Sequence, residues 1–334
     1  IRRGYIVKFI PDNFQREEPY THRLQQMGVE VFWGKYYQKT IRNWICNNQN
    51  EIDFAFLSYP NASLRYIDIF KQFGIPVMYY GMDLHYIRLQ REANLFGDKY
   101  KAKEAKTLYE KEAYLIKNCD SVYYPSLDEV EILRKEFHRN DAKQLMVNVY
   151  DTDAVMKVYR PCERNGIMFI GGYKHMPNVD AVLWFSHHIF PQIYDELQIP
   201  FFVAGADMPS DISNIEVKGI EKLGELTDAE LEEMYKRIKM IVVPLRYGAG
   251  IKAKVIEAMY HGVPVVTTEI GIEGIPNDTQ AVKVVNEGDD FAEAVIQLYT
   301  LDKKLEVMSE KGRQMIRKYY SREAAWSHIA DDFI

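Results

Sequence analysis

Two lysines follow a short glycine loop in the second half of the chain. Gly248, Ala249 and Gly250 form the loop, and Lys252 and Lys254 occupy the first turn of the helix that we expect after it. Cations in the first turn oppose the helix dipole, at a cost of ~0.3–1 kcal/mol. The arrangement favours an anion against the loop, because backbone N–H groups, the dipole and two ammonium groups would converge on it. We therefore predict an anion site here, and a diphosphate is the natural ligand.

The alternative is that both lysines are solvated and no ligand binds beside them. Lys254 would then pair with Glu257, three residues further along the same helix. The helix pattern by itself does not separate the two interpretations.

The elements around the loop alternate between strands and helices. Residues 240–245 form an apolar run that indicates a buried strand, and residues 251–261 have the apolar spacing of a helix. Gly262 suits the left-handed position after that helix, with Pro264 just beyond it. Residues 263–268 indicate the next strand. A strand, a glycine loop, a helix and a strand in this order predict a parallel α/β sheet.

The same segment, residues 244–274, resembles the donor-binding signature of retaining GT-B glycosyltransferases of family four, the group one glycosyltransferases. More narrowly, it is similar to a branch found in bacterial polysaccharide and O-antigen assembly. That branch carries a Pro-Leu-Arg-x-Gly-x-Gly-x-Lys-x-Lys loop, a Glu-Ala-Met helix and a Thr-Thr-x-x-Gly-x-Glu-Gly turn, all present here in order. The match is long, and therefore more specific than a lone glycine motif. It implies an α/β protein of two Rossmann-like, doubly wound domains that face a cleft.

The resemblance assigns different roles to the carboxylates of the segment. The family has a Glu-x7-Glu motif, whose second glutamate corresponds to Glu257 and is implied to accept hydrogen bonds from the ribose hydroxyls. The first glutamate, which usually contacts the donor sugar, falls at Ala249 and is absent. Sugar recognition must therefore differ, and we expect Glu273 to supply part of it.

The strand predicted at residues 166–172 ends in two glycines that the resemblance places at the donor. Family four commonly has Gly-Arg here and a lysine five residues later, but this chain has Gly172 and Pro177 at those places. The similar branch instead has Pro-Asn, matched by Pro177 and Asn178. Phosphate binding is thus expected to move to the two lysines, with Lys174 also within reach, while the turn at residues 224–227 holds the nucleobase through its main chain. The expected donor-binding residues are Gly171, Gly172, Asn178, Leu226, Arg246, Gly248, Ala249, Gly250, Lys252, Lys254, Glu257 and Glu273.

A second set of candidates lies in the first half of the chain, where strands and helices also alternate. In doubly wound sheets, ligands bind beyond the carboxyl ends of the strands, and residues 81–85 follow the strand predicted at 77–80. This segment resembles the family's Asp-x-x-Asp-Leu-His segment, which implies that Asp83, His85 and Arg88 line the cleft. Asp83, His85 and Lys254 are the predicted catalytic residues. The alternative for His85 is an exposed residue at the start of a helix.

The predicted elements and the resemblance together divide the chain into three parts. These are an N-terminal acceptor-side domain at 1–160, a nucleotide-sugar-binding domain at 161–318, and a C-terminal helix at 319–334 that is expected to cross back to the N-terminal domain. Residues 2–5 look like the end of a helix, and the first strand and helix that the resemblance implies for the N-terminal domain are missing. We expect the sequence to begin inside a longer, multidomain chain. Further helices are predicted at 126–137, where Ser126 and Glu129 form a capping-box pattern, and at 179–197. Strands are predicted at 145–149 and 215–219.

Composition narrows the function classes. The net charge of −6 argues against a nucleic-acid partner. Cys46, Cys119 and Cys162 lack metal-ligand spacing and indicate free thiols in a reducing compartment. No apolar run has the length of a membrane-spanning helix, and no signal peptide stands out. We expect a cytoplasmic protein, with peripheral association at the inner face of the membrane left open because family members often act on lipid-linked acceptors.

Asp151-Thr152-Asp153 has the form of the metal-binding Asp-x-Asp of GT-A transferases. It falls in the linker predicted between the domains, and no other acidic or histidine cluster supports it. We therefore expect no metal and no cofactor beyond the donor itself.

These observations predict a metal-independent, retaining, hexosyltransferase-type glycosyltransferase. It would move a sugar from a nucleotide-sugar donor to a glycan or lipid-linked glycan acceptor. Two alternatives remain: a non-catalytic sugar-nucleotide-binding partner, and a sugar-nucleotide epimerase on the same fold.

Overall fold

The computed structural model describes residue 1 and residues 4–146, 149–150, 159–276, 280–286 and 288–333. The chain divides into two compact units. The first contains residues 1–81 and 111–122, and the second contains residues 82–110 and 123–334. Most of the predicted linker, with Asp151-Thr152-Asp153, lies outside the described residues. The domain boundaries predicted near residues 160 and 318 stay a prediction.

The first unit consists of short parallel strand pairs joined by helices, as the alternating pattern predicts. Strand β1 pairs with β2, and β3 pairs with β4 from Ala55↔Val77 to Ser58↔Tyr80. Helix α3 packs on β3 and β4, and also contacts α2. Ile41, Ile45 and Ile67 are buried between these elements. The bounds are β1 Lys8–Phe9, α1 Tyr20–Gln26, β2 Glu30–Val31, α2 Lys35–Asn47, η1 Gln49–Glu51, β3 Ala55–Ser58, α3 Pro60–Gln72 and β4 Val77–Tyr80.

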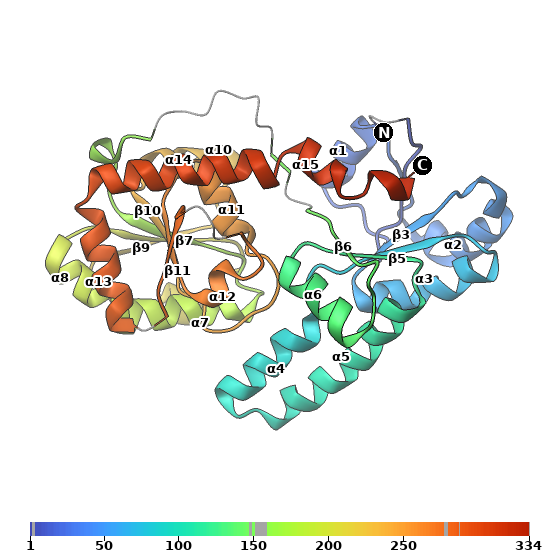
Figure 1. Cartoon of the computed structure of the whole chain (residues 1–334), viewed down its shortest axis with the longest axis horizontal. Coiled ribbons are helices and arrows are strands. Elements are labelled where there is room, and N and C mark those ends of the chain that lie inside the picture. Colours follow the sequence, from blue (N-terminus) through green and yellow to red (C-terminus); the bar gives the residue numbers. More distant parts are fainter. Residues whose placement is uncertain (2–3, 147–148, 151–158, 277–279, 287, 334) are drawn as a thin grey trace. The chain divides into compact units, whose positions relative to one another are not determined.

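The second unit contains a six-stranded parallel sheet with the order β12-β11-β10-β7-β8-β9 (Figure 1). The first strand in sequence, β7, lies at the centre, with β8 and β9 on one side and β10 to β12 on the other. This is the doubly wound order, in which the chain changes direction between β7 and β10. The strands are β7 Ile167–Ile170, β8 Phe201–Ala204, β9 Ile220–Gly224, β10 Met240–Val243, β11 Val265–Thr267 and β12 Val282–Val284.

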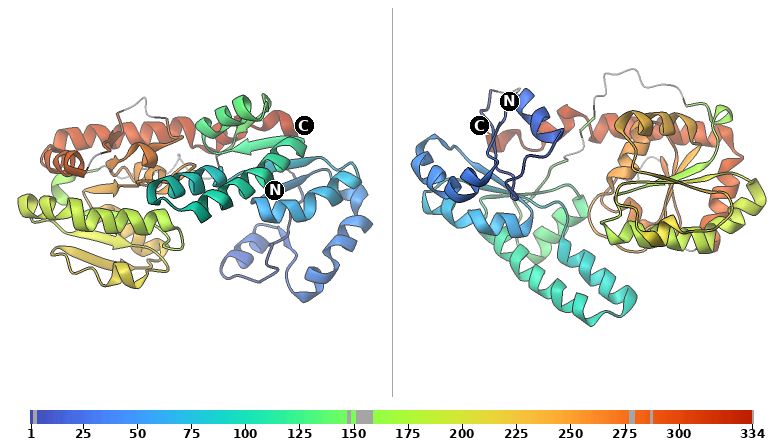
Figure 2. Two further views of the ribbon diagram at one scale, coloured as in Figure 1. Left: turned by 90° about the horizontal axis from the view of Figure 1, so that it is seen from below. Right: turned by 180° about the vertical axis from the view of Figure 1, so that it is seen from behind.

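Helices cover both faces of this sheet. Helix α13 contacts α8 on one side, while α11 packs against the long α14, which Figure 2 shows from two directions. The core between these layers is aliphatic and aromatic, with Phe169, Phe185 and Phe201 fully buried. The helices are η2 Pro161–Glu163, α7 Met176–Trp184, η3 Phe185–Ile189, α8 Phe190–Leu197, α9 Ser210–Ser213, α10 Asp228–Arg237, α11 Ala253–Tyr260, α12 Glu269–Ile272, α13 Gly288–Tyr299 and α14 Asp302–Tyr319.

The remaining elements include the segment that carries Asp83 and His85, and they belong to the second unit except for the parts of α5 and β5 within residues 111–122. Helix α4 begins at His85 and ends at Gly97, which adopts the left-handed conformation. The pair β5 and β6 is parallel, with Tyr123 opposite Lys143. The bounds are α4 His85–Phe96, α5 Lys99–Asn118, β5 Ser121–Tyr124, α6 Leu127–Glu136, β6 Lys143–Gln144, α15 Arg322–Ser327 and η4 Ala330–Phe333. The described part of the chain contains no helix that is both long and apolar enough to cross a membrane.

Several predicted elements differ from those observed. Helix α4 was not predicted as an element and appeared only in the alternative for His85; Ala93 is the one residue of α4 that is buried. The strand predicted at 215–219 lies at β9 instead: the alternating pattern runs through both segments, but Gly219, at φ +84°, separates them and only β9 pairs with β8. The strand predicted at 145–149 was placed too late in the chain: the observed strand, β6, is Lys143–Gln144, and the described residues 145, 146 and 149 lie in no strand.

The helix predicted at 179–197 is a helix, a π-helical turn and a second helix in succession. Pro191 lies in the first turn of α8 and supplies no backbone N–H, which interrupts the regular ladder at this point. The C-terminal helix predicted at 321–332 likewise divides into α15 and η4. Its end contacts the β5–β6 pair, because Asp332 accepts hydrogen bonds from the Tyr123 hydroxyl at 2.8 Å and from Lys143 Nζ at 2.7 Å.

Candidate functional site

The topology of the six-stranded sheet places the candidate site. Ligands of doubly wound sheets bind beyond the carboxyl ends of the strands, where neighbouring strands send their chains in opposite directions. Here these strands are β7 and β10. The loop after β7 carries Gly171 and Gly172, and the loop after β10 carries Gly248 and Gly250. The two glycine segments singled out in the sequence therefore lie at the ends of adjacent strands.

Lys254 reaches from α11 to the loop after β7. Its Nζ donates a hydrogen bond to Asn178 Oδ1 at 2.6 Å and lies 4.0 Å from the centre of the Phe169 ring. Asn178 in turn donates from Nδ2 to the Gly172 carbonyl at 2.8 Å. Burial, together with the charge of Lys252, lowers the pKa of Lys254 to about 7. No carboxylate pairs with Lys254 among the described residues, so the alternative in which it pairs with Glu257 is not observed.

Gly171 leaves room for the Lys254 and Asn178 side chains, which approach its backbone closely. A Cβ atom there would lie 2.7 Å from Lys254 Nζ and 2.7 Å from Asn178 Nδ2. The open space beside Gly172 is different, since a Cβ there meets nothing within 4 Å. The first glycine thus lets the ammonium group lie against the end of β7.

Lys252 occupies the N-cap position of α11 and is turned inward, with only 8% of its surface exposed. Its Nζ donates to the Ala249 carbonyl at 3.1 Å and also to the Gly250 carbonyl, and lies 3.8 Å from Glu273 Oε2. Burial lowers the pKa of Lys252, while Glu273 opposes that shift. Lys252 therefore braces the glycine loop in this structure, and its role as a phosphate ligand stays a prediction.

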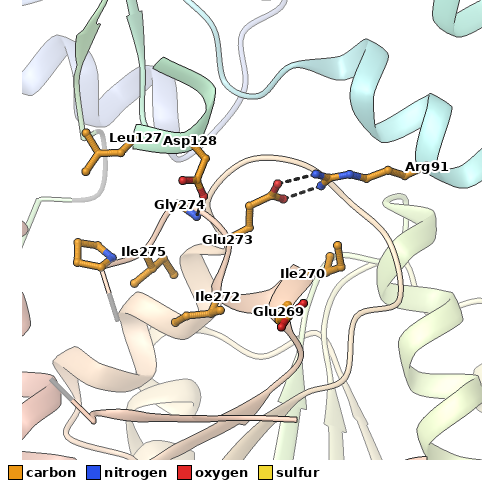
Figure 3. Close-up of a pocket in the computed structure, with 10 residues that line it drawn as sticks. Arg91, Leu127, Asp128, Glu269, Ile270, Ile272, Glu273, Gly274 and Ile275 are labelled. Carbon is orange, nitrogen blue, oxygen red and sulfur yellow. Dashed lines mark hydrogen bonds and ion pairs between the residues drawn. The ribbon is translucent and has the colours of Figure 1, made fainter. Parts of the chain in front are cut away.

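Glu273 is held by an arginine that the sequence analysis missed. Arg91 on α4 forms a two-fold ion pair with Glu273, both N–O distances being 2.7 Å, and donates to the Gly248 carbonyl at 2.7 Å (Figure 3). The same guanidinium thus joins the glycine loop to the Gly-Ile-Glu-Gly turn. Since α4 was not predicted as a helix, nothing in the sequence indicated that Arg91, one helical turn after Arg88, would face the same site.

The candidates Asp83, His85 and Arg88 lie together, as predicted. His85 Nε2 is 3.2 Å from Asp83 Oδ1, and Arg88 Nε is 3.4 Å from Asp83 Oδ2. Arg88 also approaches His175 Nδ1 at 3.3 Å, at the N-cap of α7. Burial and the Arg88 charge lower the pKa of His175 to about 4, so it is neutral at neutral pH. His175 is a second residue that the sequence analysis missed.

The glycine loop contacts the Asp83 segment directly. Gly250 has φ +67°, and a Cβ atom there would lie 2.7 Å from Asp83 Cβ. Any other residue at Gly250 would thus be strained and would also collide with Asp83. The two motifs that are far apart in the sequence form one continuous surface.

Glu257 lies one turn into α11, on the side of the helix that faces α10. Burial and the neighbouring Asp228 carboxylate raise its pKa, and among the described residues no group donates a hydrogen bond to its side chain. Leu226 lies in the turn just before α10 and is half-buried. Arg246 is already occupied, because its Nε donates to Asp180 Oδ2 at 2.9 Å and it lies over the Trp184 ring. Lys174 points outward and pairs with Asp207 at 3.1 Å.

A cavity of about 460 Å³ lies on the other side of the Glu273 turn. Figure 3 shows Glu273 and Arg91 at one end of it and the start of α6 at the other. The Gly274 N–H donates to Asp128 Oδ2 at 2.9 Å, which ties the turn to α6. The lining residues are Arg91, Leu127, Asp128, Glu269, Ile270, Ile272, Glu273, Gly274, Ile275 and Pro276. Within the described residues, no group of three or more histidine, cysteine or acidic side chains could hold a metal ion.

Comparison with known proteins supports the fold and a glycosyltransferase domain. Residues 164–301 match the family model described as Glycosyl transferases group 1. An uncharacterized 44.6 kDa protein in the cps region of Klebsiella pneumoniae is 23% identical over 172 residues, which cover 49% of this chain and 44% of that protein. The match thus spans less than half the length of that curated relative.

Solved structures resemble the whole of the chain. Sucrose-phosphate synthase from Thermosynechococcus elongatus is 13% identical with a TM-score of 0.73, over 99% of this chain and 89% of that one. HepE of Anabaena in complex with UDP-glucose is 12% identical with a TM-score of 0.69, over 98% of each chain. TarM of S. aureus is 16% identical with a TM-score of 0.68, over 86% of this chain and 57% of that one. The chain has a GT-B fold.

The GT-B fold and the group 1 match, taken together, support a glycosyltransferase. The α/β fold class predicted from the sequence is confirmed. The roles predicted for the individual site residues stay predictions.

Proposed function

We propose that this protein transfers a sugar from a nucleotide-sugar donor to a glycan or lipid-linked glycan acceptor, with retention of the anomeric configuration and without a metal ion. The observation that carries the proposal is the cluster of Lys254, Asn178 and Gly171 at the carboxyl ends of β7 and β10, where the winding direction of the sheet changes. A half-buried ammonium without a carboxylate partner in the described part of the chain, beside two glycine loops, suits the diphosphate of such a donor.

The electrostatics of the cluster suit the chemical step. As the bond between the anomeric carbon and the diphosphate oxygen breaks, negative charge grows on the leaving group, and Lys254 with the loop N–H groups would stabilise it. The new bond forms between the anomeric carbon and the acceptor oxygen, whose proton passes to the leaving phosphate oxygen. In this scheme Asp83 and His85 contact the sugar and the acceptor, while the Glu257 carboxylate accepts hydrogen bonds from the ribose hydroxyls.

Relatives of the same fold support the choice of donor class. HepE was solved with UDP-glucose, and TarM with UDP and an α-GlcNAc-glycerol compound. The relative from Klebsiella pneumoniae lies in a cps region. From the ligands of HepE and TarM we infer a nucleotide-sugar donor for the present chain. From the cps region of the relative we infer a role in polysaccharide or O-antigen assembly.

We place the protein in the cytoplasm, in contact with the inner face of the membrane where a lipid-linked acceptor would lie. The support is the junction of α4 and α5. Leu95, Phe96 and Tyr100 are exposed there, beside Lys99 and Lys103. Exposed apolar side chains interleaved with lysines suit an anionic lipid surface.

The test has two stages. Calorimetric titration with several nucleoside diphosphates first identifies the one that binds, and the matching nucleotide sugar is then incubated with candidate glycan acceptors. Nuclear magnetic resonance of the product is expected to show the donor's anomeric configuration, and the yield is expected to be unchanged in excess chelator. Conversion of the donor sugar to an epimer without acceptor would favour an epimerase, and binding without any turnover would favour a non-catalytic partner. Loss of transfer with chelator, restored by manganese, would contradict metal independence.

A further inference from the structure

Glu129 combines deep burial with an unusual hydrogen bond. It is the third residue of α6 and only 2% of its surface is exposed. The sequence pattern predicts a capping box, in which its carboxylate returns to the Ser126 N–H. The first half of the box forms, since the Glu129 N–H donates to Ser126 Oγ at 3.4 Å. The carboxyl group, however, accepts the Leu84 N–H at 2.7 Å through Oε1. The predicted second half is therefore replaced by a contact to the Asp83–His85 segment.

The other carboxyl oxygen of Glu129, Oε2, has no hydrogen-bond partner among the described residues. A buried carboxylate without a partner costs several kcal/mol when it is ionised. A carboxylic acid of the same shape avoids most of this cost and still accepts the Leu84 N–H through its carbonyl oxygen. Burial raises the pKa of Glu129 well above its ordinary value, and the Leu84 hydrogen bond offsets only part of that shift.

The charges around Glu129 also disfavour a further negative charge. Asp83 and Glu273 are both close enough to raise its pKa, whereas Lys252 lowers it. Arg91 also interacts electrostatically with Glu129, but it is already paired with Glu273. On α6 itself, Asp128 accepts a hydrogen bond from Gly274. Arg88 lies beside Asp83, while Arg91 and Lys252 lie beside Glu273. With Asp128, three carboxylates thus stand against three cations, and an ionised Glu129 would leave an excess of negative charge.

We propose that Glu129 is a positioning residue, held as a neutral carboxylic acid, that fixes the Asp83–His85 segment through the Leu84 N–H. Its neutrality serves the site because a bound diphosphate brings negative charge to the neighbouring glycine loop, which an ionised Glu129 would oppose. The role in turnover rests on the proposed function. The protonation state and the contact to Leu84 do not, and they can be measured separately.

Two measurements test the contact and the proton without any substrate. Hydrogen exchange of residues 82–87 is expected to be about tenfold faster in Glu129→Ala than in wild type, because the Leu84 N–H loses its acceptor, and nearly unchanged in Glu129→Gln. The infrared difference between wild type and Glu129→Gln at neutral pH is expected to contain the carbonyl band of a protonated carboxylic acid. Glu131→Ala, on the exposed side of the same helix, is the matched control.

Kinetics test the positioning role. Glu129→Gln imitates the neutral acid, so kcat and the donor KM are expected to stay within about threefold of wild type, while Glu129→Ala lowers kcat about tenfold or more with little change in donor KM. As pH rises far enough to ionise Glu129, activity of the wild type is expected to fall, and this fall is expected to be absent in Glu129→Gln.

Glu129→Gln keeps the size and shape of the side chain. Its infrared, exchange and kinetic measurements therefore test the proposal even if Glu129→Ala does not fold. The proposal is overturned if the infrared band is absent, if exchange at residues 82–87 is as fast in Glu129→Gln as in Glu129→Ala, or if Glu129→Gln loses turnover like Glu129→Ala. A protein that passes the exchange and infrared tests but transfers no sugar would contradict the proposed function alone.

Discussion

Lys254 Nζ lies 2.6 Å from Asn178 Oδ1, although the two residues are 76 positions apart in the chain. The contact joins the helix after β10 to the helix after β7, at the point where the sheet reverses its winding direction. The ammonium group also lies over the Phe169 ring, with no carboxylate partner among the described residues. We therefore expect its counter-ion to be the anionic part of a ligand.

The first prediction concerns the affinity that Lys254 provides. Lys254→Ala is expected to weaken nucleoside-diphosphate binding by ~1–3 kcal/mol, because a charged hydrogen bond to the ligand is lost. Asn178→Ala is expected to weaken it less, since it orients the lysine without carrying charge. Isothermal titration calorimetry measures both. Lys174→Ala is the matched control, because that lysine is exposed and pairs with Asp207; an equal loss in this variant would contradict the assignment.

The second prediction concerns pH. In the free protein the pKa of Lys254 is lowered to about 7, whereas a bound diphosphate favours the charged form and raises that pKa. Binding therefore takes up a proton above pH 7, and affinity is expected to decrease as pH rises from 7 towards 10. Calorimetry in buffers of different ionisation enthalpy reports this uptake. Lys254→Arg, which stays charged, is expected to lack it, so equal proton uptake in that variant would refute the mechanism.

The third prediction concerns the two-fold ion pair between Arg91 and Glu273. The pair is partly buried and joins α4 to the Gly-Ile-Glu-Gly turn. A double-mutant cycle with alanine at both positions is therefore expected to give a coupling of ~1–2 kcal/mol in the free energy of unfolding. The exposed pair of Lys236 and Glu233 provides the control, with a smaller expected coupling because solvent screens exposed ion pairs. Chemical denaturation measures both cycles, and equal coupling would show that burial adds nothing at Arg91.

The fourth prediction separates the roles of Glu257 and His85. Glu257→Ala is expected to weaken nucleoside-diphosphate binding, and Glu257→Gln to weaken it less, because the carboxylate is predicted to accept hydrogen bonds from the ribose hydroxyls. His85→Ala is expected to leave that affinity nearly intact and to lower turnover, since His85 would meet only the sugar and the acceptor. Titration and transfer assays on the same variants decide between them. Wild-type affinity in Glu257→Ala, or normal turnover in His85→Ala, would remove the corresponding assignment.

The sequence determined the central unit of this protein. Apolar runs at β10 and β11, a glycine loop and a helix between them can form only a parallel strand–helix–strand unit, because each element must bury its apolar side against the next. Lys254 was recognised from the glycine loop and the helix after it, whereas the resemblance to family four pointed to Gly171, Asn178, Asp83 and His85. All of these motifs follow predicted strands, and the carboxyl ends of parallel strands face ligands. Their roles in binding and catalysis stay predictions.

The tertiary structure decided how the charged side chains are used. Lys252 and Lys254 are two residues apart and look equivalent in the sequence, yet one braces the glycine loop and the other lies against Asn178. Glu129 has the spacing of a capping box, but the nearby Leu84 N–H takes its carboxyl group. Arg91 gave no signal, because its partner Glu273 lies 182 positions further along the chain. A side chain's partner depends on which atoms from distant segments lie within about 3 Å of it, and no local pattern records that distance.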